Sequence, residues 1–175
     1  MGTDKAFVEV GGVAMVVRVA SALTAAGCTP VVLVGGDGAL LARTGLPTVA
    51  DQWPGAGPAG GVLTTLAATT TDLVVVASCD LPLLEAGVVR ALVAALVADP
   101  DLGVAVATTD RPQLSLTAWR RVVVADRLRE HWDAGARALH ELVAAVPSTA
   151  VVVPAAALRN VNTPDQLSAA EATAG

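Results

Sequence analysis

The sequence predicts an α/β fold in which a parallel β-sheet is covered by helices on both faces. Two observations carry this prediction: short apolar runs with the length of buried strands, and longer stretches with helical spacing that alternate with them. Helices that connect parallel strands lie on the faces of the sheet, which gives three layers. The 175 residues suffice for one domain with a buried core, and no linker or internal repeat divides them.

Four runs have the composition of buried strands. Each consists mainly of β-branched and small apolar residues and ends at a glycine, a proline or a polar residue. We expect strands at 30–35, 73–78, 103–108 and 150–154. Ligands bind beyond the carboxyl ends of the strands in such sheets, so a site is expected in the loops that follow these runs.

Helical spacing characterises the segments between the strands. In 136–146, for example, the apolar residues recur on one face of a helix. The helices expected are 13–26, 59–70, 85–98 and 136–146. A final short helix is expected to begin at Thr163-Pro164, with the threonine as N-cap and the proline at the first helical position.

Charge and composition exclude several classes of function. The net charge of −5 argues against broad binding to nucleic acid, which needs a basic surface. No apolar run reaches the roughly 18 residues of a membrane span. Cys28 and Cys79 are isolated thiols, which is typical of a reducing compartment. We therefore expect a cytoplasmic protein with neither a nucleic-acid partner nor a membrane segment.

The stretch DQWPGAGPAGG at 51–61 is the first candidate binding loop. It packs four glycines and two prolines before a helix. Glycine allows the backbone to approach a ligand closely, and a helix N-terminus offers unpaired amides for a phosphate or the edge of a base. An ordinary tight turn is the alternative, although it needs fewer glycines and prolines.

Two charged residues are further candidates. Asp80 follows the expected strand 73–78 within SCDLP, where its carboxylate could cap a helix or bind Mg²⁺, a cation that prefers hard oxygen ligands. Lys5 is the only lysine among eleven basic residues. It is either a solvated terminal residue or a cation placed against a phosphate.

The stretch NVNTPDQL at 160–167 carries two asparagines before the last helix. Cap chemistry explains the threonine, but it does not require both Asn160 and Asn162, whose amides could contact a polar substrate. His131 and His140 lack companions at metal-ligand spacing, and we expect them at the surface. Arg120-Arg121 is expected on a solvated face, with contact to a phosphate as the alternative.

Taken together, these stretches resemble the molybdenum cofactor guanylyltransferases, a MobA-type branch of the MobA-like NTP transferase family. The matching stretches are, in family order, GTDKAFVEVGGVAM, VADQWPGAGPAGG, SCDLPLL and NVNTPDQL. The segment DAGARALHEL is similar to the family's Gly-Arg helix near the C-terminus. The GPxAGG form of the central loop looks more like the guanylyl than the cytidylyl branch.

The resemblance implies a Rossmann-like nucleotidyltransferase that transfers GMP from GTP to molybdopterin, or its molybdenum form, and releases pyrophosphate. It implies Mg²⁺ as the metal, and other proteins of molybdenum cofactor biosynthesis as partners. The implied catalytic residues are Lys5, against the triphosphate, and Asp80, which would hold the Mg²⁺. The implied nucleotide-binding residues are these two with Asp51, Gly55, Gly57 and Gly60, and the implied substrate-binding residues are Asn160, Asn162 and Gln113.

The amino end departs from the family pattern. In the family, the lysine follows a first strand and a glycine-rich loop of the form LAGGxSxRMGxDK, of which only the segment from Met1 to Lys5 is present. We therefore expect the first strand of the sheet, between 30–35 and 73–78, to be missing. Each backbone group left unpaired there would cost about 1–3 kcal/mol if buried. The hypothesis that follows is that Met1 is an internal codon and that 1–175 is a single, N-terminally truncated domain.

A second departure lies at RPQLSLTAW, where Pro112 precedes Gln113 although the family usually reads Gln-Pro-Leu. Two further functions stay open at this point: a cytidylyltransferase of the same fold, and an inactive truncated remnant that binds a nucleotide without turnover. Nucleotide preference separates the first from a guanylyltransferase. Magnesium-dependent release of pyrophosphate separates the second, because a pure binder releases none.

Overall fold

The centre of the molecule is a four-stranded sheet. In the computed structural model, which describes residues 5–174, its strand order is β5-β7-β6-β8. These strands span Leu73–Ala77 (β5), Val104–Thr108 (β6), Pro112–Arg120 (β7) and Ser148–Val152 (β8). Strand β6 runs parallel to β8, whereas β7 runs antiparallel to both β5 and β6.

The expectation of an all-parallel sheet is therefore wrong at β7. Only the turn 109–111 separates β6 from β7, and so short a connection can join only antiparallel neighbours. The strand escaped the sequence analysis because its serine and threonine interrupt the apolar run, although Leu116 to Trp119 are all buried.

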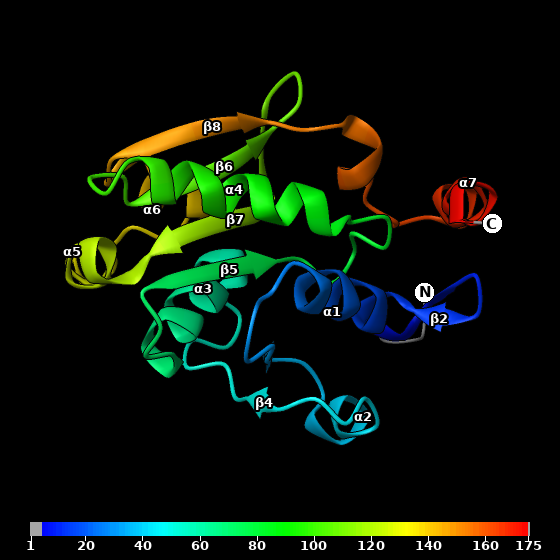
Figure 1. The fold of residues 1–175 in the computed structure, drawn as a ribbon. Helices are drawn as coiled ribbons and strands as arrows, with labels where there is room; N and C mark the ends of the chain where they lie inside the picture. Colours follow the sequence, from blue (N-terminus) through cyan, green and yellow to red (C-terminus); the bar gives the residue numbers. More distant parts are fainter. Residues whose placement is uncertain (1–4, 175) are drawn as a thin grey trace.

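Helices cover both faces of this sheet, as expected for three layers (Figure 1). Helix α4, Ala86–Ala98, packs with α1, Met15–Ala25, over one face. The other face is covered by α3 (Gly57–Ala68), α5 (Arg121–Asp133) and α6 (Leu139–Ala144). Each layer has its own apolar cluster, around Leu92 on the first face and Trp119 on the second.

The predicted helices are confirmed with shifted ends, whereas α5 and the short helix α2 (Gly38–Ala42) were not predicted. Helix α5 has no counterpart among the predictions, and Arg120 lies at its N-cap rather than on a solvated face. The Arg120 guanidinium pairs with Asp72 at 3.0 Å and also donates to the carbonyl of Leu96, so it ties the strand end to two neighbouring segments. Val13 and Ala14 form a strand that pairs with residues 9–10, and α1 therefore begins only at Met15.

The first and last elements of the described residues lie on the same side of the molecule (Figure 1). The 3-10 helix η1, Lys5–Phe7, leads into a small hairpin of β1 (Glu9–Val10) and β2 (Val13–Ala14). The last helix, α7 (Pro164–Ala174), contacts β1 and follows the 3-10 helix η2, Ala155–Leu158. The expectations for residues 1–4 lie outside the described residues. None of the described helices is both long and apolar enough to cross a bilayer.

A second, smaller parallel sheet stands apart from the first. It consists of β3, Leu33–Val34, and β4, Thr48–Val49, which are connected through the short helix α2, Gly38–Ala42. Strand β3 was expected over 30–35, and β4 and α2 were not expected at all. Among the described strands, β3 pairs only with β4 and β5 pairs only with β7. The two strands on either side of the expected missing strand are thus unpaired with each other.

A cavity of about 910 Å³ separates β3 from β5. We call it the slot. Helices α1 and α3 line it with β3 and β5, and its apolar lining includes Val16, Leu23, Val34, Val62 and Val75.

The backbone register shows which groups face the slot. The Asp72 carbonyl accepts from the amide of Arg121, directly after β7, and the Ser78 amide donates to Ser115 in β7. The N–H and C=O groups of Leu73, Val75 and Ala77 therefore point toward the opposite edge. In β3, Leu33 and Gly35 donate to the β4 side. Both edges of the slot therefore present backbone groups to it.

Candidate functional site

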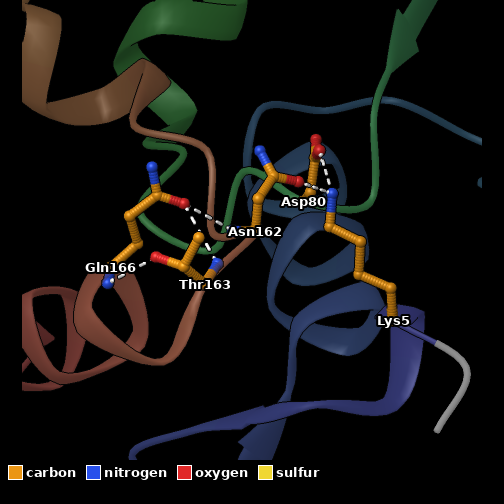
Figure 2. Close-up of polar contacts among 5 residues, drawn as sticks. All are labelled: Lys5, Asp80, Asn162, Thr163 and Gln166. Atoms are coloured by element: carbon orange, nitrogen blue, oxygen red, sulfur yellow. Dashed lines mark hydrogen bonds and ion pairs between the residues drawn. The ribbon is translucent and has the colours of Figure 1, made fainter. Parts of the chain in front are cut away.

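Three distant segments of the chain meet at the carboxyl end of β5 (Figure 2). Lys5 from η1 donates from Nζ to Oδ2 of Asp80 at 2.7 Å and to Oδ1 of Asn162. The Asp80 side chain is only 13% exposed, whereas that of Lys5 is 37% exposed. Three residues singled out from the sequence for different reasons thus form one polar cluster, which we call the Lys5 cluster.

The loop that carries Asp80 is fixed from two sides. Arg18, on α1, donates from Nε to the carbonyl of Pro82 at 2.9 Å and from Nη1 to the carbonyl of Val10 at 3.1 Å. The amide of Val161 donates to the carbonyl of Asp80 at 3.1 Å. Asp80 does not cap a helix, because the N-cap of α4 is Glu85. The alternative interpretation of Asp80 as a cap is therefore wrong.

A capping box shapes the loop that carries Asn162. Thr163 accepts a hydrogen bond from the amide of Gln166 at 3.3 Å, and Gln166 Oε1 accepts from the amides of Asn162 at 2.7 Å and Thr163 at 3.2 Å. The cap predicted at Thr163 and the start of α7 at Pro164 are confirmed. The Asn162 side chain takes no part in the cap, and this leaves its amide group for the Lys5 cluster.

Two buried oxygen atoms in this region have no hydrogen-bond partner among the described residues. They are Oδ1 of Asp80 and Oδ1 of Asn160, and both residues line the slot. Buried acceptors are nearly always satisfied, so these atoms point to a donor or a cation that belongs at this place. The described residues hold no group of three or more His, Cys, Asp or Glu side chains that could bind a metal by themselves.

The glycine-rich loop 51–61 begins after β4 and ends inside α3. Asp51 Oδ1 accepts from the amide of Trp53 at 2.9 Å and from the hydroxyl of the fully buried Thr64 at 3.0 Å. Gly55 and Gly57 are exposed and have φ angles of +82° and +63°, which disfavour any other residue.

Gly60 has a different role from Gly55 and Gly57. It is buried, and a Cβ atom there would lie 2.9 Å from the Cβ of Ala56 and 3.1 Å from the carbonyl oxygen of Trp53. Gly60 therefore allows the loop to pack closely on α3, and the surface open to a ligand is that of Gly55 and Gly57.

Gln113 lies at the start of β7 and, among the described residues, makes no hydrogen bond to the Lys5 cluster. Its Nε2 donates to the hydroxyl of Thr109 at 3.2 Å. The same hydroxyl donates to Asp110 at 2.8 Å, and this hydrogen bond holds the pKa of the Asp110 carboxyl below its usual value. His131 and His140 are exposed, as expected.

The sequence analysis missed two residues that support the cluster, Arg18 and Gln166. The signal for Arg18 was a charged residue inside the otherwise apolar stretch 13–20. The signal for Gln166 was its position three residues after Thr163, which is the spacing of a capping box. Of the two cysteines, Cys28 is half-buried, and burial raises the pKa of its thiol.

Comparison with known proteins shows the family to which the chain belongs. Residues 1–160 match the family described as MobA-like NTP transferase domain. A molybdenum cofactor guanylyltransferase from Shewanella loihica is 30% identical over 97 residues, which are 55% of this chain and 49% of the relative. The match therefore spans about half the length of that curated relative.

Solved structures share the fold at low sequence identity. The molybdopterin-guanine dinucleotide biosynthesis protein A from Archaeoglobus fulgidus is 21% identical with a TM-score of 0.78, covering 99% of this chain and 91% of that one. The 2-C-methyl-D-erythritol 4-phosphate cytidylyltransferase from Thermus thermophilus is 20% identical with a TM-score of 0.74, covering 97% and 93%. These structures establish the Rossmann-like fold of nucleotidyltransferases for this chain.

Proposed function

Because the chain belongs to the MobA-like NTP transferase family, we propose that it is a guanylyltransferase that joins GMP from GTP to molybdopterin. The products are molybdopterin guanine dinucleotide and pyrophosphate. The observation that carries the proposal is the Lys5 cluster, in which a lysine, a carboxylate and an amide converge at the carboxyl end of β5. This is the edge of an α/β sheet where ligands bind.

The transfer exchanges one phosphorus–oxygen bond for another. An oxygen of the molybdopterin phosphate attacks the α-phosphorus of GTP, and the bond from the α-phosphorus to the bridging oxygen of the β-phosphate breaks. The electron pair of that bond leaves with pyrophosphate. Such transfers depend mainly on positioning and charge stabilisation. The Lys5 ammonium group, which pairs with Asp80 here, can turn toward the triphosphate and stabilise its negative charge.

The oxygen atoms at this place fit a magnesium ion. Within the described part of the chain, the buried Oδ1 of Asp80 has no hydrogen-bond partner, and Mg²⁺ is commonly held by one or two carboxylates together with substrate phosphates. Asp80 would hold the ion, with the neighbouring Asn160 Oδ1 as a second acceptor. The chemistry that Mg²⁺ supplies is neutralisation of the charge that develops on the leaving pyrophosphate.

The glycine-rich loop is the proposed guanine site. Gly55 and Gly57 expose backbone that a base can approach, and Asp51 fixes the start of the loop while contacting the nucleotide. Asn162 and Asn160 lie on the pterin side, with Gln113 at the edge. GTP rather than CTP is proposed from the GPxAGG form of the loop. A cytidylyltransferase is the second candidate, because the fold is equally that of cytidylyltransferases.

The slot bears on whether residues 1–175 work alone. Within residues 5–174, β3 and β5 have no strand partner on the edges that face the slot. The slot also has an apolar lining, and two residues with buried acceptors, Asp80 and Asn160, line it. We infer that a further strand of the same single domain occupies the slot in the working enzyme, which would then be longer than 175 residues. We also propose that this enzyme is cytoplasmic and acts with other proteins of molybdenum cofactor biosynthesis. If the slot stays open, the 175 residues are an inactive nucleotide-binding remnant, and this is the third candidate.

A single assay separates these functions. The chain is incubated with molybdopterin, Mg²⁺ and either GTP or CTP, and both pyrophosphate and the dinucleotide product are measured. The guanylyltransferase gives pyrophosphate and a guanine dinucleotide with GTP. Product with CTP alone identifies the cytidylyltransferase, and binding of GTP without pyrophosphate identifies the remnant.

A further inference from the structure

The anchor of the glycine-rich loop lies outside the loop, in helix α5. Trp53 is the one large side chain of the stretch 51–61, and its ring lies 5.8 Å from the ring of Trp132 at an interplanar angle of 64°. This edge-to-face geometry is favourable for aromatic pairs. Trp132 is buried, with 7% of its surface exposed, whereas Trp53 is half-buried.

Two arginines enclose the aromatic pair. The guanidinium of Arg129 lies 5.6 Å from the centre of the Trp53 ring, and that of Arg137 lies 4.3 Å from the centre of the Trp132 ring. Arg137 is held in place because its Nη1 donates to the carbonyls of Trp132 at 2.6 Å and Ala136 at 2.8 Å. The contacts thus form a continuous row from α5 and the segment before α6 to the loop.

The backbone of the loop is tied to the same tryptophan. The Trp53 amide donates to Asp51, and its carbonyl accepts from the amide of Ala56 at 3.0 Å. A Cβ at Gly60 would lie only 3.1 Å from that carbonyl oxygen. The position of the Trp53 ring therefore sets the path of the backbone through Gly55. A loop fixed in advance loses less freedom when it binds a ligand, which raises affinity.

We propose that Trp132 is a positioning residue for nucleotide binding: it holds the glycine-rich loop in its binding conformation through Trp53 without contacting the ligand. The inference rests on the proposed function only where GTP binding is measured. The other measurement, hydrogen exchange of the free protein, needs no nucleotide.

The test compares Trp132→Leu, which removes the aromatic edge, with Trp132→Phe, which keeps one. The matched control is Val124→Ala, a fully buried residue two turns away on the same helix and in the same apolar cluster. In Trp132→Leu we expect faster hydrogen exchange at the amides of Trp53 and Ala56 and roughly 3- to 10-fold weaker GTP binding, from the strength of an edge-to-face pair. The KM for GTP should rise with kcat unchanged, and Trp132→Phe should restore most of both.

Two results would overturn the proposal. Equal effects in Val124→Ala would mean that Trp132 contributes only to general stability, and unchanged exchange at Trp53 in Trp132→Leu would mean that Trp132 does not hold the loop. If the unaltered chain binds no GTP, the proposed function fails. The exchange rates still decide the positioning role in that case, because they are measured on the free protein.

Discussion

Two strands of similar composition have different surroundings in this molecule. Strand β5 reads LVVVA and β6 reads VAVAT, yet the first four residues of β6 are buried, whereas only Val74 is buried in β5. The reason is the number of neighbours. Strand β6 pairs with β7 on one edge and β8 on the other, while β5 pairs with β7 and faces the slot. The burial of a strand is thus decided by its partners rather than by its own residues.

The same contrast divides the molecule into a closed half and an open half. The closed half, β6 to β8 with α4 to α6, contains most of the fully buried side chains. The open half contains the slot, the glycine-rich loop and the Lys5 cluster. The closed half therefore contributes most of the stability, and the open half contains the candidate site. Substitutions in the closed half should mainly lower stability, and those in the open half should mainly lower activity.

The largest effect is expected at the open end of β5. Asp80→Asn removes the charge that pairs with Lys5 and, under the proposed function, the magnesium ligand. We expect nucleotidyl transfer to fall about 10²- to 10³-fold, the usual cost of losing one group that stabilises developing charge. Steady-state pyrophosphate release measures it.

The control for that substitution is Asp72→Asn, at the other end of the same strand. Asp72 pairs with Arg120, and its side chain is 45% exposed, so this change should leave turnover within about 2-fold, as for most surface pairs. Equal losses in both variants would mean that Asp80 acts through the strand and not at the site.

The next largest effect compares one valine from each strand. Val106→Ala in the closed half empties a fully packed position, with 5% exposure, and should lower the free energy of unfolding by about 2 kcal/mol. Val76→Ala in β5 should cost less, about 1 kcal/mol, because Val76 is only partly buried. Urea unfolding of the two variants measures the difference, and equal costs would break the comparison between the strands.

A smaller effect is expected at the loop that carries Asn162. Gln166→Ala removes the acceptor of two amides, which should cost about 1 kcal/mol of stability and weaken the contact between Asn162 and Lys5. Gln166→Glu keeps the acceptor and should behave like the unaltered chain. Thermal unfolding and the hydrogen exchange of the Asn162 amide check both variants; identical exchange in Gln166→Ala would show that the cap does not hold the loop.

The smallest effect is a pH dependence in the closed half. Glu141 accepts from the amides of Ala138 and Arg137 at the start of α6, and these hydrogen bonds lower its pKa. A lowered folded-state pKa stabilises the fold above the ordinary glutamate pKa of about 4.3, and the contribution disappears as the pH falls through the folded value. Glu141→Gln should flatten this part of the stability–pH curve, and an unchanged curve would contradict the assignment.

The sequence predicted the layers and most elements because strand and helix patterns are local. It did not predict β7, because Ser115 and Thr117 interrupt its apolar run and the burial of Thr117 is visible only when β7 lies between β5 and β6. The three members of the Lys5 cluster were each singled out from the sequence. Their meeting depends on tertiary structure, namely the Val161–Asp80 hydrogen bond and the Arg18 contacts, which no local pattern encodes.

The roles of the glycines in the loop 51–61 also depend partly on tertiary structure. Gly55, Gly57 and Gly60 were predicted together as one binding surface, but the packing of Gly60 against Trp53 and Ala56 becomes visible only when α3 is in place. The Trp53–Trp132 contact joins residues 79 positions apart in the sequence, and its partner helix was not predicted. A pattern read along the chain identifies such a loop without identifying what holds it.

The central claim is that the open half binds a magnesium–nucleotide complex. Hydrogen exchange of the 175-residue chain with and without Mg²⁺ and GTP tests it most directly. We predict slower exchange in 51–61, 78–82 and 160–163, with the amides of β6 and β8 unchanged. Exchange that GTP leaves unaltered throughout, or slows only in the closed half, would contradict the account.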